Sequence, residues 1–511
     1  MADELETAAD ALLDAGWERG WLAIRQTLRH DGKGMPAAIK TRLESLEERI
    51  KPQTLVGRVK AIVLSGSTAG VYFLDGETTV AGFERVDQTA RELGELVAGD
   101  ADAFAAVLPL VVRKEQGRQG AFGEGLAAGV DSIDDCWAAL VSAFEATLEE
   151  ERNVQVLRGF MYGAFRRDSA KFEAFLDAAM ERASFINLVP FLQLAAPLGD
   201  SGCTRLMASL DNPSVPSWAF RYLGHSRATQ ALSDDWVAQL LQRLSVKPDG
   251  MEVAVDVLSM HIFDNPNPVG PRVRQLGRAL LTNVPLTQHD HGLDHALERL
   301  VEFFLQGREG EAAARELLTT VRRGFEDYSL SGYGLAGTLA ALFKVQPNAA
   351  LETLVGDGLD EGNTYFRRRS LMGVQGVSAL SEVPIEMLVA WCEKGGPERW
   401  SHVAPLLVAF DSQTEQSGLH WPASVLALLK RAPQPIEVAR SLVELIEPMS
   451  YSGSRAEAIR QRLPLLDALA RELGAMHAEQ IELWRSQIIR IMDREARREL
   501  EEHRARDERF E

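Results

Sequence analysis

Three histidines and two aspartates stand close together in one short stretch of the sequence, from His289 to His295. If this stretch is helical, His291 and His295 lie one turn apart on the same face, which is the spacing of metal-binding histidine pairs. Hydrolytic zinc sites commonly use three protein ligands and a water molecule. The three histidines, with Asp290 or Asp294, would therefore suffice for a metal-dependent hydrolase.

The same stretch is also typical of the start of a helix. Thr287 or Asp290 is placed to cap an apolar run with helical spacing, which consists of Leu293, Leu297, Leu300, Val301 and Phe304. The stretch resembles the His-x-His-x-Asp-His loop of metallo-β-lactamase-type hydrolases, but it has one extra residue before the aspartate and lacks the flanking strand pattern. We therefore predict a helix start, no metal site and no catalytic residue, and the hydrolase is the alternative.

A cluster of aromatic and basic residues forms a second candidate site, which consists of Tyr365, Phe366, Arg367, Arg368 and Arg369. Arginines beside aromatic rings can bind an acidic peptide or a phosphate. Three consecutive arginines in an acidic protein also pair readily with neighbouring carboxylates. We treat the cluster as a candidate partner-binding site, with nucleic acid as a further possible ligand.

Composition limits the classes of function. The chain has 55 basic and 74 acidic side chains and a formal net charge of -19, so its surface as a whole should repel phosphate backbones. No apolar run approaches the roughly 20 residues of a membrane helix, and the acidic start lacks the features of a secretory signal. We expect a cytoplasmic protein that does not bind membranes, and binding of nucleic acid would need a local basic stripe.

Cofactor sites are also not expected. The three cysteines, Cys136, Cys203 and Cys392, are odd in number and far apart, which argues against a disulfide framework or a cysteine-rich zinc site. The glycines of the 332–337 stretch follow no predicted strand, and the chain contains no Gly-Lys-Ser/Thr phosphate loop. The sequence thus predicts no nucleotide or metal cofactor.

The elements that position these residues are predicted to be helices. Apolar residues recur at helical spacing, and proline- or glycine-containing breaks separate the helical stretches every few tens of residues, which is the rhythm of helix pairs. Ser132 with Asp135 and Ser454 with Glu457 have the spacing of helix caps. We predict an all-α fold, a HEAT-like or irregular α-solenoid of stacked helical hairpins with units of roughly 40 residues.

Breaks and glycines divide the chain into four predicted parts. They are an N-terminal helical region (1–115), a glycine-rich connection (116–130), the α-solenoid repeat array (131–473) and a C-terminal amphipathic, then charged helix (474–511). The glycine-rich segment is compatible with a mobile loop or with a weak, close-packed helix. One short strand is possible at 71–74.

Two expectations concern packing. The C-terminal helix has an apolar seam of Ile481, Trp484, Ile488 and Ile491, so its first half should dock and its second half should project into solvent. The tryptophans should pack between helix layers, and they include Trp137, Trp218, Trp236 and Trp391.

Several short sequence segments in the last third of the chain resemble segments from one region of a known protein family. They are residues 384–392, 396–400, 447–456, 462–467 and 504–511. They are similar to the C-terminal helical-repeat region of large multidomain bacterial proteins that carry an effector and a signal-transducing P-loop NTPase module, several of which are linked to anti-phage defence. The similarity covers about 380–511, with a looser likeness at 55–64. This chain has neither the NTPase motifs nor an effector domain, so it is either a fragment or split product of such a protein or a stand-alone relative.

The resemblance implies a sensor or scaffold and gives no catalytic residue. Extended helical stacks provide long binding surfaces. We therefore predict a non-enzymatic scaffold or sensor that binds a protein partner, such as an NTPase or effector chain or a phage protein.

Overall fold

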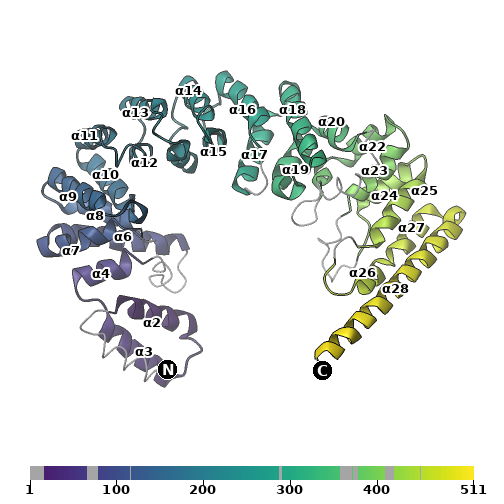
Figure 1. Ribbon diagram of the computed structural model, residues 1–511, viewed down its shortest axis with the longest axis horizontal. Helices are drawn as coiled ribbons and strands as arrows, with labels where there is room; N and C mark the ends of the chain where they lie inside the picture. The colour runs from purple at the N-terminus through teal and green to yellow at the C-terminus, as the bar shows by residue number, and fades with distance from the viewer. Residues whose placement is uncertain are drawn as a thin grey trace. The chain divides into compact units, whose positions relative to one another are not determined.

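The fold is all-α, as the periodicity predicts (Figure 1). The computed structural model describes residues 17–65, 79–114, 117–286, 291–356, 371, 378–408, 419–448 and 451–510. These residues contain no β-strand, and Arg113 and Arg152 form an isolated β-bridge. The strand considered at 71–74 lies outside the described residues. None of the described helices is both long enough and apolar enough to cross a lipid bilayer.

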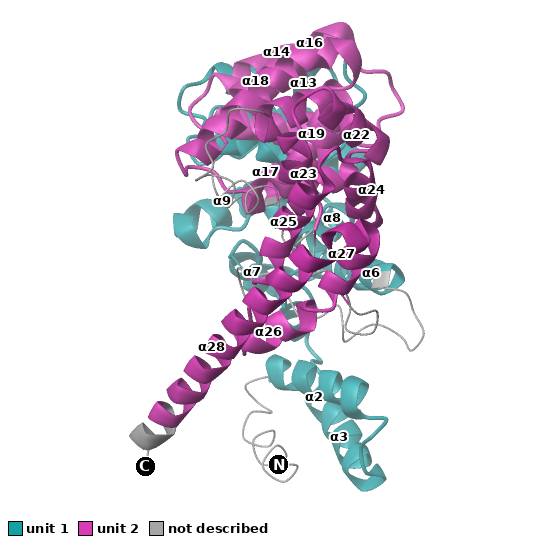
Figure 2. Cartoon of the chain, turned by 90° about the vertical axis from the view of Figure 1, so that its right-hand side faces the viewer, with its two compact units in different colours: residues 1–232 teal, residues 233–511 magenta. Residues whose placement is uncertain are grey.

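The chain forms two compact units, residues 1–232 and 233–511 (Figure 2). Unit 1 contains α2 (Glu18–Asp31), α3 (Ala37–Ile50), α4 (Leu55–Ile62), α6 (Thr79–Ala98), α7 (Ala101–Val111), α8 (Gln119–Gly129), α9 (Ile133–Ala146), α10 (Gln155–Arg167), α11 (Ser169–Met180), α12 (Val189–Gln193), α13 (Asp200–Asp211) and the 3-10 helices η1 (Glu149–Glu151) and η2 (Ser217–His225). Alternate helices pack side by side: α4 on α6, α6 on α8, and α8 on α10, with α7 on α9 in the other layer.

Unit 2 repeats this packing rule. Its first part contains α14 (Asp234–Ser245), α15 (Gly250–Ile262), α16 (Pro271–Asn283), α17 (His291–Phe304), α18 (Gly307–Glu326), η3 (Gly332–Leu335), α19 (Ala336–Val345), α20 (Pro347–Ala350) and the π-helix η4 (Leu351–Val355). Its second part contains η6 (Ala379–Glu382), α22 (Ile385–Glu393), α23 (Glu398–Leu406), α24 (Ala423–Arg431), α25 (Pro435–Val443), η7 (Glu444–Ile446), α26 (Arg455–Arg462), α27 (Leu465–Leu473), η8 (Ala475–His477) and α28 (Ala478–Phe510). α14, α16 and α18 follow one another in one layer, and α15, α17 and α19 in the other.

Local capping explains where several helices begin. The Ser132 hydroxyl accepts a hydrogen bond from the amide of Asp135 at 3.2 Å, and Ser454 accepts one from the amide of Glu457 at 3.0 Å. Both caps were predicted from the Ser-x-x-acid spacing and are confirmed. They satisfy amides that the first turn of a helix leaves without an intrahelical partner.

Aromatic side chains fill the core of unit 1. The Trp137 ring stacks on Phe175 with ring centroids 5.1 Å apart and is buried, as predicted. Trp391 is also buried, in unit 2. The prediction is wrong for Trp218, which is 52% exposed, because it lies on the outer side of the 3-10 helix η2.

The glycine-rich segment predicted as a connection contains the central helix of unit 1. Residues 119–129 form α8, which packs between α6 and α10, and the boundary between the two compact units falls instead between Leu232 and Ser233 in the sequence. A Cβ atom on Gly123 would lie 2.2 Å from the carbonyl oxygen of Val156, and one on Gly125 would lie 1.9 Å from that of Arg91. The glycines therefore let three helix backbones touch, so the close-packed alternative is the correct one.

The C-terminal helix docks over more of its length than the apolar seam predicts. Ile481, Trp484 and Ile488 are buried as expected. Glu495, in the charged half, is also buried and pairs with Arg455 at 3.2 Å. The Glu499 carboxylate accepts hydrogen bonds from the Ser454 hydroxyl and the Arg455 amide at 2.6 and 2.7 Å. The expectation that the whole second half projects into solvent is thus wrong, because polar contacts with α26 extend the docked segment.

Candidate functional site

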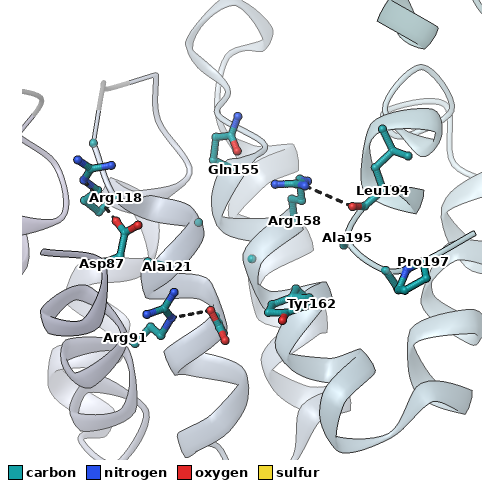
Figure 3. Close-up of a pocket in the computed structure, with 15 residues that line it drawn as sticks. Asp87, Arg91, Arg118, Ala121, Gln155, Arg158, Tyr162, Leu194, Ala195 and Pro197 are labelled. Carbon is teal, nitrogen blue, oxygen red and sulfur yellow. Dashed lines mark hydrogen bonds and ion pairs between the residues drawn. The ribbon is translucent and has the colours of Figure 1, made fainter. Parts of the chain in front are cut away.

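A pocket of about 700 Å³ lies across the close-packed helices of unit 1 (Figure 3). α6, α8, α10 and the connection after α12 each supply part of its wall. We call it the α8 pocket. Small residues form the part nearest α8 and α10, namely Gly117, Gly120, Ala121 and Gly159.

The close approach of α8 and α10 explains why the pocket is lined by small residues. A Cβ atom on Gly159 would lie only 1.8 Å from the carbonyl oxygen of Gly120. A Cβ atom on Gly120 itself would meet nothing closer than the Gln155 carbonyl oxygen at 3.8 Å. Gly159 is thus required by helix packing, whereas Gly120 leaves the first turn of α8 bare toward the pocket.

Charged side chains supply the chemistry of the pocket. Arg118 pairs with Asp87 at 3.5 Å, both at one end (Figure 3). The Arg91 guanidinium donates to the Glu124 carboxylate at 2.7 Å, and Arg166, from the next turns of α10, pairs with the same carboxylate at 3.2 Å. Arg91 and Arg118 thus each have a carboxylate partner within the protein, and Arg166 shares that of Arg91.

Arg158 is the arginine of the pocket without such a partner among the described residues. Its Nη2 donates to the backbone carbonyl of Leu194 at 3.3 Å (Figure 3). Its guanidinium lies 5.2 Å from the ring centroid of Phe191. Within the described part of the chain no carboxylate pairs with it, and its buried Nε has no hydrogen-bond partner. Burial lowers the pKa of this guanidinium, but an arginine stays charged at neutral pH.

The pocket therefore carries a local positive charge in an acidic protein. Three arginines and two carboxylates line it, which leaves one positive charge against a formal net charge of -19 for the chain. The amides of Gly120 and Ala121, in the first turn of α8, have no acceptor within their own helix. The positive end of the α8 dipole adds to the same effect. This arrangement suits an anionic group.

Aromatic rings continue from Arg158 away from the pocket. Below the guanidinium, Phe191 packs on Tyr222 with ring centroids 4.2 Å apart. Tyr222 and Trp218 are exposed on η2, and Tyr162, also exposed, lines the pocket beside Arg158. Tyr162 thus places an exposed aromatic side chain at the pocket itself, and such side chains are frequent at binding surfaces.

The structure gives a different role to two of the residues in the histidine stretch. Asp294 accepts hydrogen bonds from the Gly337 and Thr338 amides, both at 2.9 Å, and thereby caps α19. His295 contacts Glu298 at 3.2 Å and Arg299 at 3.1 Å. His289, Asp290 and the side chain of His291 lie outside the described residues. Among the residues that are described, no group of three acidic, histidine or cysteine side chains is placed to hold a metal ion.

The second predicted site lies outside the described residues. It comprises Tyr365, Phe366, Arg367, Arg368 and Arg369. Its role as a partner-binding site stays a prediction.

The α8 pocket was missed because its charged residues are far apart in the sequence. Arg91, Arg118 and Arg158 lie on different helices, and only the packing of α6, α8 and α10 brings them together. The available signal was the run of glycines in α8, which is typical of close helix packing.

No protein-family model matches this sequence, and no curated protein matches it either.

Proposed function

We propose that this chain is a non-enzymatic helical-repeat scaffold or sensor that binds a protein partner through the α8 pocket. The observation that carries the proposal is Arg158, a partly buried charge with no carboxylate partner among the described residues, in a pocket that four segments of unit 1 build. Proteins seldom leave a buried charge unpaired unless it meets a ligand.

The packing pattern supports a scaffold. In both units each helix packs mainly on its near neighbours in sequence, the pattern of repeat proteins, so we infer a HEAT-like or irregular α-solenoid. Repeat proteins of this kind bind partners over surfaces that several repeats build together. The α8 pocket is such a surface, because no single helix pair forms it.

The setting is proposed from the resemblance of residues 380–511. It supports a cytoplasmic bacterial protein of an anti-phage defence system, with an NTPase chain, an effector chain or a phage protein as the partner. The arginines of 367–369 are proposed as a further contact for the same partner.

Site-specific photocrosslinking tests the function. A photoreactive amino acid replaces Tyr162, which is exposed and lines the pocket, and in a matched control it replaces Leu148, which is exposed elsewhere on unit 1. In bacteria with and without phage infection, we expect the probe at 162 to crosslink one specific protein and the probe at 148 not to do so. Identical crosslinks from both positions, or none from 162 in either condition, would contradict the proposal.

A further inference from the structure

The charges of the α8 pocket indicate which kind of segment it binds. We propose that the pocket recognises a carboxylate-rich segment of the partner protein and that Arg158 binds one of its carboxylates. This inference rests on the proposed function, because it assigns the chemistry of the ligand in the same pocket.

Arg158 is already held in place for this task. The Leu194 carbonyl accepts a hydrogen bond from one end of the guanidinium, and the guanidinium carbon lies over the Phe191 ring. A guanidinium has five N–H donors, so donors remain after the bond to Leu194. Since the side chain is already ordered, little further entropy is lost when a carboxylate accepts from it.

The number of charges favours a carboxylate over a phosphate. Arg118 pairs with Asp87, and Arg91 shares Glu124 with Arg166, so Arg158 is the arginine of the pocket lining that has no carboxylate partner among the described residues. Its guanidinium can bind one carboxylate. A phosphate group carries nearly two charges and usually meets several arginines that are free to bind it, and the two carboxylates in the wall would repel it more strongly than they repel a carboxylate of one charge.

The charge of the whole chain disfavours a long polyanion. With a formal net charge of -19, the surface as a whole should repel nucleic acid. A short acidic segment needs only the local site. The exposed ring of Tyr162, which lines the pocket with Arg158, further favours a segment in which an aromatic residue accompanies the acidic ones.

Peptide binding to the full chain tests this inference by fluorescence anisotropy. The probe is a labelled peptide of alternating glutamate and serine with one central tyrosine. Its counterparts replace every glutamate by glutamine or by phosphoserine, and a single-stranded oligonucleotide of similar length is the last ligand. We expect the glutamate peptide to bind at low salt and the glutamine peptide to bind at least about tenfold more weakly.

Variants of the protein complete the test. Arg158→Gln should weaken binding of the glutamate peptide about tenfold or more, and Arg158→Lys should fall in between because it keeps the charge but not the planar fork. Arg182→Gln is the matched control, because Arg182 is exposed in unit 1, pairs with Glu145 and does not line the pocket. Its affinity should stay unchanged. If Arg158→Gln does not fold, the affinities of the wild-type protein for the glutamate and glutamine peptides still show whether the carboxylates of the peptide are needed for binding.

Several results would overturn the inference. They are equal binding of the glutamate and glutamine peptides, no binding of either, no effect of Arg158→Gln in a folded protein, or tighter binding of the phosphoserine peptide or the oligonucleotide. If any of these occurs while the probe at 162 still crosslinks a specific protein, the scaffold function stands and only the carboxylate assignment fails.

Discussion

Substitution of Gly123 by alanine should separate two helices that now touch. The added Cβ atom would lie 2.2 Å from the Val156 carbonyl oxygen and 2.8 Å from the Phe160 amide nitrogen, both backbone atoms of α10. Because ordinary contacts of a Cβ atom begin near 3.4 Å, α8 and α10 must move apart by about 1 Å. Overpacking of this kind costs about 1–3 kcal/mol or more, against a gain of up to about 1 kcal/mol in helix propensity.

Gly120→Ala on the same helix is the matched control. There the nearest atom to the new Cβ is 3.8 Å away, so the substitution should be neutral or should stabilise by up to about 1 kcal/mol. For a unit of this size, a loss of 1 kcal/mol lowers the melting temperature by about 2–4 °C.

The assay combines thermal unfolding of the full chain with hydrogen exchange of the amides in α8 and α10. We expect Gly123→Ala to melt earlier and to exchange faster in these helices, and Gly120→Ala to do neither. Equal effects of the two substitutions, or stabilisation by Gly123→Ala, would refute the argument that backbone contact requires the glycines.

Three further predictions follow from other contacts. Asp294→Ala should lower the stability of unit 2 by about 0.5–2 kcal/mol, because the α19 cap is lost. Elemental analysis of the wild-type protein should find less than about a tenth of a metal equivalent per chain. A stoichiometric metal would restore the hydrolase alternative. The hydrogen bond from the Ser454 hydroxyl lowers the pKa of Glu499. The ionised Glu499 therefore stabilises the docking of α26 at pH values above the ordinary pKa of a glutamate, and this stabilisation is lost as the pH falls through the lowered pKa. Melting temperatures measured against pH should show this loss in the wild-type protein but not in Glu499→Gln. Burial raises the pKa of the Cys136 and Cys392 thiols to about 12. Alkylation at pH 8, followed by mass spectrometry, should therefore find the less buried Cys203 modified first. Early modification of either buried thiol would contradict the described packing.

Sequence reasoning succeeded where the physical cause is local. The helical period depends on residues three and four apart, and the caps at Ser132 and Ser454 depend on residues three apart. Both therefore appear in the sequence without knowledge of the tertiary structure. The all-α class follows from the same local signals.

It failed where distant residues decide the outcome. A pattern of apolar residues predicts that α28 stops docking after Ile491, but Glu495 and Glu499 continue the contact through Arg455 and the amides of α26. The sequence alone could not distinguish such a buried charge from a solvated one, because the difference lies in the partner that another helix supplies.

The α8 pocket combines two roles that fall on different residues. Gly123 and Gly159 bring the helix backbones together but carry no side chain that could recognise a ligand. Recognition must come from the arginines and the tyrosine around them, and within the part of the chain that the structure describes Arg158 makes a single side-chain hydrogen bond, to the Leu194 carbonyl. Loss of Arg158 should thus remove binding with little loss of stability, whereas an added methyl group on Gly123 should reduce both, because it moves the walls of the pocket apart. This difference separates a binding surface from a merely structural packing of helices.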